Sequence, residues 1–286
     1  MKSIRKTKIN RVIREFYDKH PFPGYNLGDY KSKYDLYYDA NIYGKLLADQ
    51  IPENVKIIDF GCGTGRHSCL LGTKNRKVLG IDISDKSLKI ANQLKNKLEF
   101  KNVNFQKQDI FNLKINFKAD YILSIGVLHH THNIDEAFGQ IIKYLKRDGY
   151  IILGLYNTYG RLITKLLRLV NKPSLYSIEK LDFYINNIAK SKNEMDMWRY
   201  DMYRCPYELT MSIDGVLKMF KKHNIEYINS FPNNIALNEQ DWPRECERLF
   251  SKKREGKLWE HALIQFKWIF SEYKSGGLFM MIGRKK

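Results

Sequence analysis

The chain has 286 residues, 43% of them hydrophobic, which is enough to bury a sizeable core. Its net charge of +18, from 49 Lys and Arg against 31 Asp and Glu, admits nucleic acid, anionic membranes and anionic small molecules as partners. The four cysteines show neither CxxC pairs nor metal-ligand spacing, which argues against a disulfide framework or a cysteine-rich zinc site.

The N-terminal 20 residues form a basic, amphipathic pattern that predicts a helix but lacks the apolar core of a signal peptide. The stretch "HPFPGYN" ends this helix, and a further helix is expected over residues 40–50. We interpret residues 1–45 as a helical cap or lid. Because no apolar run approaches 18 residues, we expect a cytoplasmic protein without a membrane span.

Strands and helices alternate over residues 46–157, the expected cofactor-binding core. Alternation at this spacing predicts an α/β fold with a doubly wound, mostly parallel sheet. The expected helices begin at Arg66, cover 85–98 and cover 134–149, where Gly149 closes the last one. The expected strands are 55–60, 77–84, 102–110, 119–126 and 150–157.

The pattern loosens after Asn157. Residues 158–208 predict a helical, aromatic-rich insertion on the acceptor side. Residues 209–286 are expected to complete the sheet, with a helix at 211–224, a strand at 225–231, a second helical insertion at 233–275 and a last strand at 276–286.

A glycine-rich loop follows the first expected strand in "DFGCGTGR". Gly61, Gly63 and Gly65 are spaced G-x-G-x-G, and Arg66 stands where the dinucleotide fingerprint needs its third small residue. Asp59 precedes the loop, where its negative charge would repel a bound pyrophosphate. The loop therefore favours a ligand with a cationic amine and no phosphate.

Two more acids follow the next strands. Asp82 ends the second strand, where a carboxylate can bind both ribose hydroxyls. Asp109 follows the third strand, where a carboxylate can accept a hydrogen bond from an exocyclic amine. Together with Asp59, these acids describe an adenosine that carries a cationic amino-acid tail.

The segments "DFGCGTG", "GIDIS", "QDI" and "ILSIGVLHHTHN" resemble the class I S-adenosylmethionine-dependent methyltransferases over roughly residues 45–157. "GVLHH" and "YLKRDGYIILGLYN" are most similar to the branch that includes ubiquinone- and menaquinone-biosynthesis enzymes. The resemblance implies a Rossmann-like sheet of seven strands, the last antiparallel, and S-adenosyl-L-methionine as cofactor. It also implies that Asp59 and the loop face the methionine, Asp82 the ribose, Ile83 the adenine ring and Asp109 its amino group. The implied cofactor site comprises Asp59, Gly61, Cys62, Gly63, Gly65, Asp82, Ile83, Asp109, Ile110 and Ser124.

The segment "HHTH" after the fourth strand offers candidates for a general base. His129 and His130 either act on the acceptor or shape the cofactor loop. We expect no metal, because histidines on one turn rarely converge on a tetrahedral ion and no further ligand cluster is evident. Cys205 is an alternative covalent nucleophile without a supporting motif.

Aromatic residues gather in the N-terminal segment and in the 158–208 insertion. They are expected either to close a lid over the methyl group or to form a satellite core. The candidates are Tyr17, Phe22, Tyr25, Trp198, Tyr200 and Tyr203.

We therefore expect a methyltransferase acting on an oxygen or nitrogen of a small molecule, with the basic charge favouring an anionic one. One alternative is a tRNA-modifying methyl- or carboxymethyl-transferase, which the charge and aromatics favour. Against it, basic residues are scattered along the chain and no RNA-binding module is evident. Another alternative is a cofactor-binding partner protein without catalysis.

Overall fold

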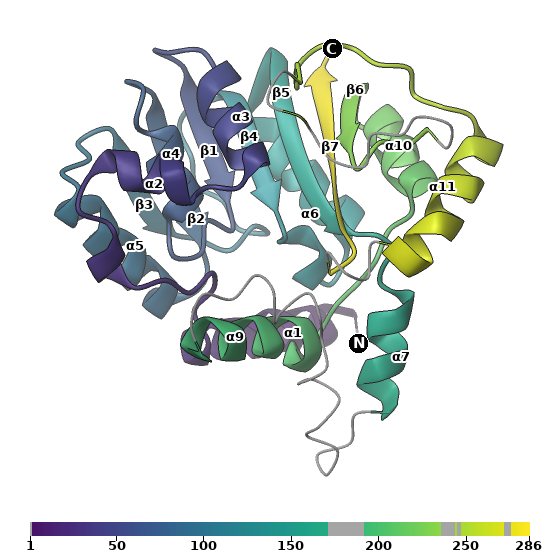
Figure 1. Cartoon of the computed structure of the whole chain (residues 1–286), viewed down its shortest axis with the longest axis horizontal. Coiled ribbons are helices and arrows are strands. Elements are labelled where there is room, and N and C mark those ends of the chain that lie inside the picture. Colours follow the sequence, from purple (N-terminus) through teal and green to yellow (C-terminus); the bar gives the residue numbers. More distant parts are fainter. Residues whose placement is uncertain (1, 171–191, 236–243, 245–246, 272–275) are drawn as a thin grey trace.

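The computed structural model describes residues 2–170, 192–235, 244, 247–271 and 276–286 (Figure 1). Its strands form a seven-stranded sheet in the order β3-β2-β1-β4-β5-β7-β6, in which β7 runs antiparallel to both of its neighbours. This confirms the expected doubly wound, mostly parallel sheet with a reversed last strand. The strands are β1 (Lys56–Phe60), β2 (Lys77–Asp82), β3 (Val103–Lys107), β4 (Ala119–Ile125), β5 (Leu145–Tyr156), β6 (Ile225–Phe231) and β7 (Leu278–Lys285).

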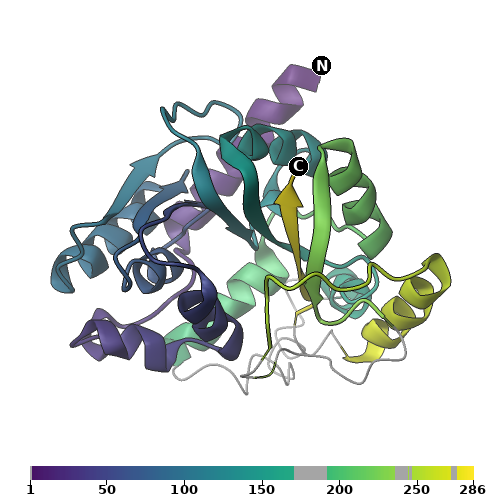
Figure 2. The same cartoon turned by 90° about the horizontal axis from the view of Figure 1, so that it is seen from above.

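Helices cover both faces of the sheet, as the view from above shows (Figure 2). The α-helices are α1 (Lys2–Lys19), α2 (Lys33–Asp39), α3 (Ile42–Gln50), α4 (Arg66–Leu71), α5 (Asp85–Lys97), α6 (Ile134–Ile141), α7 (Leu162–Val170), α9 (Lys192–Arg199), α10 (Ile213–Lys222) and α11 (Leu258–Ser271). Short 3₁₀ turns are η1 (Leu27–Asp29), η2 (Leu128–His130) and η3 (Ile142–Tyr144), and η5 (Tyr200–Arg204) is a π-helical turn.

Alternation of side chains along the strands divides the core into two layers. In β7, Phe279 and Met281 join the core beneath α6, α10 and α11. Met280 and Ile282 point to the opposite face and join the core beneath α3, α4 and α5. Because both faces of the sheet are covered, the strands are nearly continuous apolar runs.

Short polar side chains begin the helices that follow the strands. The Ser84 hydroxyl accepts the Ser87 amide at 3.1 Å at the start of α5, and the Asn133 amide oxygen accepts the Glu136 amide at 3.1 Å at the start of α6. Such caps satisfy amides that the first helical turn leaves without partners.

The expected helix over 134–149 is wrong in its second half. α6 ends at Ile141, η3 continues only to Tyr144, and β5 already begins at Leu145. Gly149 lies inside this strand, where a Cβ would stand 2.8 Å from the carbonyl oxygen of Asp120 on β4. The glycine therefore permits close approach of two strands and does not cap a helix.

The expected insertions are only partly helical in the described chain. α7 and α9 lie within 158–208, whereas residues 171–191 are outside the described residues. Within 233–275, α11 is helical but residues 247–257 are not. The division of the chain at residues 45, 157 and 208 stays a prediction.

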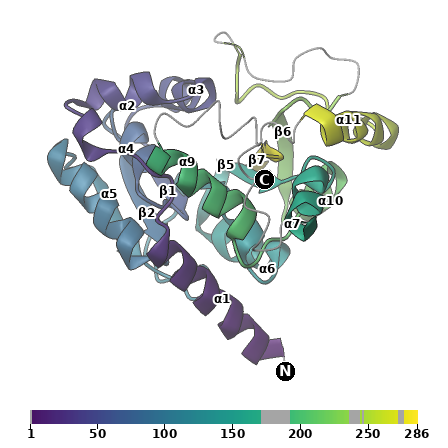
Figure 3. The ribbon, with the colours of Figure 1, turned by 60° about the horizontal axis from the view of Figure 1, so that its bottom comes forward.

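Two helices from distant parts of the chain, α1 and α9, lie across the carboxyl ends of the parallel strands (Figures 1 and 3). In open α/β sheets ligands bind at this edge, where the strand order reverses. Here the reversal lies between β1 and β4. None of the helices in the described part of the chain has the length and apolar composition that crossing a bilayer requires.

Candidate functional site

A cavity of about 480 Å³ opens at the carboxyl ends of the strands, beneath α1 and α9. Sites for small organic ligands usually have this size. The candidate residues that line it are Tyr17, Phe22, Asp59, Gly61, Cys62, Gly63, Asp82, Ile83, Asp109, Ile110, His130 and Trp198. Those that do not are Tyr25, Gly65, Ser124, His129, Tyr200, Tyr203 and Cys205.

The glycine loop presents bare backbone to the cavity. Gly61 and Gly63 have φ values of +71° and +52°, which favour glycine. A Cβ at Gly61 would stand 2.3 Å from the Val127 side chain, and one at Gly63 would stand 2.2 Å from the Phe22 carbonyl oxygen. The glycines therefore allow the loop to pack closely against Val127 and Phe22, two residues that also line the cavity.

Asp82 holds this loop in place. One carboxylate oxygen accepts the Gly63 amide at 2.8 Å and the other accepts the Ser84 amide at 2.9 Å. Burial raises the pKa of Asp82, and these two bonds oppose that rise. Each oxygen retains a lone pair, so the carboxylate can still accept hydrogen bonds from a diol.

The other two acids differ in their surroundings. Asp59 is 5% exposed and accepts the Ser68 hydroxyl at 2.6 Å. Burial raises its pKa to about 6, opposed by the Ser68 bond and assisted by the nearby Asp82. Asp109 accepts the Asn10 amide group of α1 at 2.7 Å and the Phe111 amide at 2.9 Å.

These residues fit S-adenosylmethionine. Three carboxyl groups and exposed glycine backbone line one cavity, an arrangement suited to a ribose, an exocyclic amine and an ammonium group but not to a pyrophosphate. Ile83, Ile110 and Phe111 add apolar surface for an adenine ring.

A second group of contacts joins α1 to the segment after α9 above the cavity. The Tyr17 and Tyr156 hydroxyls donate to opposite oxygens of Asp201, at 2.8 Å and 3.3 Å. The rings of Phe22 and Trp198 meet edge to face at 4.8 Å. Sequence reasoning missed Tyr156 and Asp201, because an acid within an aromatic run and a tyrosine at a strand end carry no spacing signal.

The segment between α1 and α2 is fastened to the glycine loop. The Thr64 hydroxyl donates to the Pro23 carbonyl at 2.7 Å, and the Tyr25 hydroxyl donates to the Thr64 carbonyl at 2.5 Å. Tyr25 thus supports the loop from outside the cavity and does not face the reacting methyl group.

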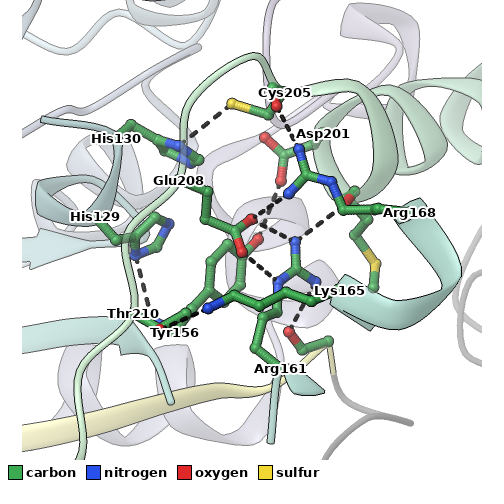
Figure 4. Close-up of polar contacts among 12 residues, drawn as sticks. His129, His130, Tyr156, Arg161, Lys165, Arg168, Asp201, Cys205, Glu208 and Thr210 are labelled. Carbon is green, nitrogen blue, oxygen red and sulfur yellow. Dashed lines mark hydrogen bonds and ion pairs between the residues drawn. The ribbon is translucent and has the colours of Figure 1, made fainter. Parts of the chain in front are cut away.

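His130 lines the cavity, and Figure 4 shows the polar contacts around its ring. Its Nδ1 is 2.9 Å from the Tyr207 carbonyl oxygen and 3.3 Å from the Cys205 sulfur. Because a carbonyl only accepts, Nδ1 carries the proton and Nε2 is the basic nitrogen of the neutral ring. Burial opposes protonation of His130, but Cys205, Asp201 and the Tyr207 carbonyl raise its pKa to about 9.

His129 has different surroundings. It is fully buried outside the cavity, and its ring stacks on Tyr156 with centroids 4.0 Å apart. Its Nδ1 accepts the Tyr156 amide at 3.3 Å. Burial, then His130 and Arg161, keep its pKa well below the usual value. The geometry gives His129 a role in placing Tyr156, not in contacting an acceptor.

Behind Tyr156 lies a buried ion pair that sequence reasoning also missed (Figure 4). Arg161 is 0% exposed, contacts Glu208 at 2.8 Å, and places its guanidinium 3.9 Å from the centre of the Tyr156 ring. Arg168 meets the same carboxylate at 3.1 Å. The network fixes one wall of the cavity.

The remaining candidates lie in the surrounding protein. A Cβ at Gly65 would stand 2.7 Å from Ala91 of α5, so this glycine serves helix packing. Ser124 is buried in β4, Tyr203 packs beside Met202, and Cys205 lies behind His130 outside the cavity. Among the described residues, no group of His, Cys, Asp and Glu has the arrangement of a metal site.

Comparison with known proteins places this geometry in a family. Residues 51–262 match the family model described as a methyltransferase domain. The chain is 29% identical over 170 residues to a protein named ubiquinone biosynthesis O-methyltransferase from Pelagibacter ubique, covering 55% of this chain and 67% of that one. It is 26% identical over 195 residues to putative methyltransferase 235L of Invertebrate iridescent virus 6, covering 64% and 71%.

Solved structures share the fold. PKMT2 from Rickettsia typhi, in complex with AdoHcy, has a TM-score of 0.56 at 18% identity, covering 92% of this chain and 54% of that one. Magnesium protoporphyrin IX methyltransferase from Synechocystis PCC 6803, with bound SAH, has a TM-score of 0.52 at 13% identity and covers all of both chains. With the family match spanning most of the chain and the acids and glycines lining one cavity, this chain belongs to the methyltransferase domain family and is a class I S-adenosylmethionine-dependent methyltransferase.

Proposed function

We propose that this enzyme transfers a methyl group to an oxygen or nitrogen of a small molecule. The observation that carries the proposal is the position of His130 in the same cavity as Asp59, Asp82 and Asp109. A covering built from α1 and the segment after α9 suits an acceptor small enough to be enclosed. Relatives named ubiquinone biosynthesis O-methyltransferase and malonyl-[acyl-carrier protein] O-methyltransferase support transfer to an oxygen atom.

The residues divide into cofactor and acceptor groups. We assign Asp59 to the cofactor's amine, Asp82 to its ribose and Asp109 to the adenine amine. The bound cofactor supplies a methyl group on a sulfonium, which needs a nucleophile in line at about 3–3.5 Å. The neutral form of His130, which a pKa of about 9 makes the minor form at pH 7, accepts the acceptor's proton on Nε2, while Tyr17, Phe22 and Trp198 exclude water.

The charge of the acceptor is a separate matter. Arg66, an arginine that lines the cavity, contacts Asp39 at 3.1 Å, so its charge is compensated. Asp201 adds a carboxylate at the acceptor end. These contacts favour a neutral acceptor over the anionic one that the chain's overall charge suggests.

The test is detection of S-adenosylhomocysteine formed from S-adenosylmethionine with panels of phenols, amines and carboxylic acids. We expect turnover with at least one small acceptor, and a loss of about 10²–10⁴-fold in kcat in His130→Ala if the histidine is a general base. Total RNA at about 150 mM salt serves as the competing substrate, because non-specific RNA binding is already weak there. Stoichiometric methylation of one RNA species would replace the small-molecule proposal.

A further inference from the structure

Some residues that line the cavity belong neither to the candidate cofactor site nor to the covering above it. We call the region that they line the Tyr43 arm. It lies on the side of the sheet covered by α3 and α4. Its walls are Leu36, Asn41, Tyr43, His67, Leu70, Leu278 and Met280.

Two residues of the arm, Leu278 and Met280, lie on β7. Leu278 pairs with Tyr156, and Met280 pairs with Phe231 on β6. Leu278 and Met280 are two residues apart, so both face the same side of the sheet. The Tyr43 ring meets Phe231 with centroids 5.6 Å apart. These pairings place Leu278 beside Tyr156 and connect Met280, through Phe231, to Tyr43.

Tyr43 itself lacks a partner for its hydroxyl. The residue is 3% exposed, and its hydroxyl meets no hydrogen-bond partner within the described part of the chain. The buried tyrosines Tyr30 and Tyr227, by contrast, both donate to oxygen atoms. A buried hydroxyl without a partner is costly, so one that lines a cavity indicates a missing ligand atom.

The arm has little net charge. Arg66 at its edge contacts Asp39, which also accepts the Tyr30 hydroxyl at 2.6 Å. Burial, then Arg66, lower the pKa of His67 to about 4, so its ring is neutral at pH 7. Leu36, Leu70 and Met280 supply apolar walls. An ionised ligand group would lose its hydration here without an opposite charge.

We propose that the Tyr43 arm binds a second part of the methyl acceptor: an uncharged, apolar group with a carbonyl, ether or hydroxyl oxygen that accepts the Tyr43 hydrogen bond. The proposal rests on the proposed small-molecule function and narrows its substrate class. The acceptor is then elongated, with its reacting atom near His130 and its apolar part along β7.

The experiment uses 2-octanone as a probe, because it combines a carbonyl with an apolar chain. Its affinity is measured by ligand-observed NMR on the full chain saturated with S-adenosylhomocysteine. We expect binding to weaken about 3- to 10-fold in Tyr43→Phe, since a single hydrogen bond contributes about that much. Tyr38→Phe, at an exposed tyrosine, is the matched control and should bind the probe like the wild type.

Two further readouts separate this role from others. The melting temperature of Tyr43→Phe should stay unchanged or rise, because the lost hydroxyl has no partner among the described residues. Its affinity for S-adenosylhomocysteine should match that of the wild type. A lowered melting temperature, weakened cofactor binding, equal probe binding by Tyr43→Phe, or no binding of 2-octanone to the wild type would each overturn the proposal. Failure of the wild type to bind S-adenosylhomocysteine would instead overturn the proposed function. The 2-octanone titration of the cofactor-free protein would then still test whether the Tyr43 arm binds the probe.

Discussion

The Tyr17 hydroxyl donates a 2.8 Å hydrogen bond to Asp201, which lies 184 residues further along the chain. The contact joins α1 to η5 over the cavity, and Tyr156 donates to the other oxygen of the same carboxylate. Burial and then the Asp201 charge raise the pKa of Tyr17 well above its ordinary value. Tyr17 therefore stays a neutral donor at physiological pH, which keeps the covering closed.

This contact predicts energetic coupling between two distant segments. In a double-mutant cycle on the free energy of unfolding, Tyr17→Phe and Asp201→Ala should couple by about 0.5–3 kcal/mol, because each removes one partner of a buried bond. Urea denaturation of the four proteins measures the coupling. The exposed Tyr38→Phe, combined with Asp201→Ala, should be additive. If the effects of Tyr17→Phe and Asp201→Ala were additive, the hydrogen bond between the two residues would contribute nothing to the free energy of unfolding.

The cofactor assignment predicts a strong effect at Asp82. Asp82→Ala should weaken S-adenosylhomocysteine binding by about 2–4 kcal/mol, since it removes a charged acceptor for the ribose and releases the Gly63 amide. Calorimetry measures the change, with the exposed Asp85→Ala as control. NAD should not bind detectably to the wild type. An unchanged dissociation constant in Asp82→Ala would show that other groups hold the ribose.

Asp59 predicts a pH-dependent affinity. Its pKa of about 6 in the free protein means that the carboxyl is partly neutral below pH 6. An ammonium group binds the ionised form, so S-adenosylhomocysteine affinity should rise by about fivefold from pH 5 to 6, by about twofold more from pH 6 to 7, and level off above pH 7. Calorimetric titrations from pH 5 to 8 give the profile. Asp59→Asn should bind weakly with a flat profile, and an equally steep profile in that variant would assign the proton elsewhere.

His130 predicts a loss of stability at alkaline pH. Its folded-state pKa of about 9 lies above the unfolded value, so its contribution is complete below about pH 6.5 and disappears as pH rises through 9. The free energy of unfolding should fall by up to about 3 kcal/mol more in the wild type than in His130→Gln over this interval. Urea denaturation at pH 6.5 and 9.5 measures the difference. Parallel pH profiles for the two proteins would contradict the raised pKa.

Two loop glycines predict a contrast in stability. Both Gly63 and Gly126 have positive φ, so alanine costs each about 1–2 kcal/mol of backbone strain. A Cβ at Gly126 meets nothing within 4 Å, whereas one at Gly63 meets the Phe22 carbonyl. Gly63→Ala should therefore lower the free energy of unfolding clearly more than Gly126→Ala. Thermal and urea unfolding without ligand give the comparison, and equal losses would exclude the Phe22 contact.

The central sheet could be predicted because its signals are local. Apolar runs that end in Asp59 and Asp82, with glycines between them, identify strands and a crossover without knowledge of distant contacts. Gly149 misled the prediction because glycine ends helices and also permits close strand approach, and only the position of Asp120 distinguishes the two.

The acceptor end could not be predicted to the same depth. Its geometry depends on contacts between segments far apart in sequence, such as Tyr17 with Asp201 and Arg161 with Glu208. The "LHH" motif does not distinguish His129 from His130. The role of His130 depends on the Tyr207 carbonyl, 77 residues away, and that of His129 depends on the stacked Tyr156 ring from β5. An orphan hydroxyl such as that of Tyr43 has no sequence signature at all.

The cavity is lined by residues from Asn10 to Met280, with the last strand supplying part of its wall. A nascent chain can therefore not complete this pocket until the residues through Met280 have left the ribosome. Cofactor binding to the finished pocket then stabilises the N-terminal helix, the sheet and the last strand as one unit, by an amount that grows with ligand concentration. Occupancy by S-adenosylmethionine thus couples the cellular supply of methyl donor to the lifetime of the folded enzyme.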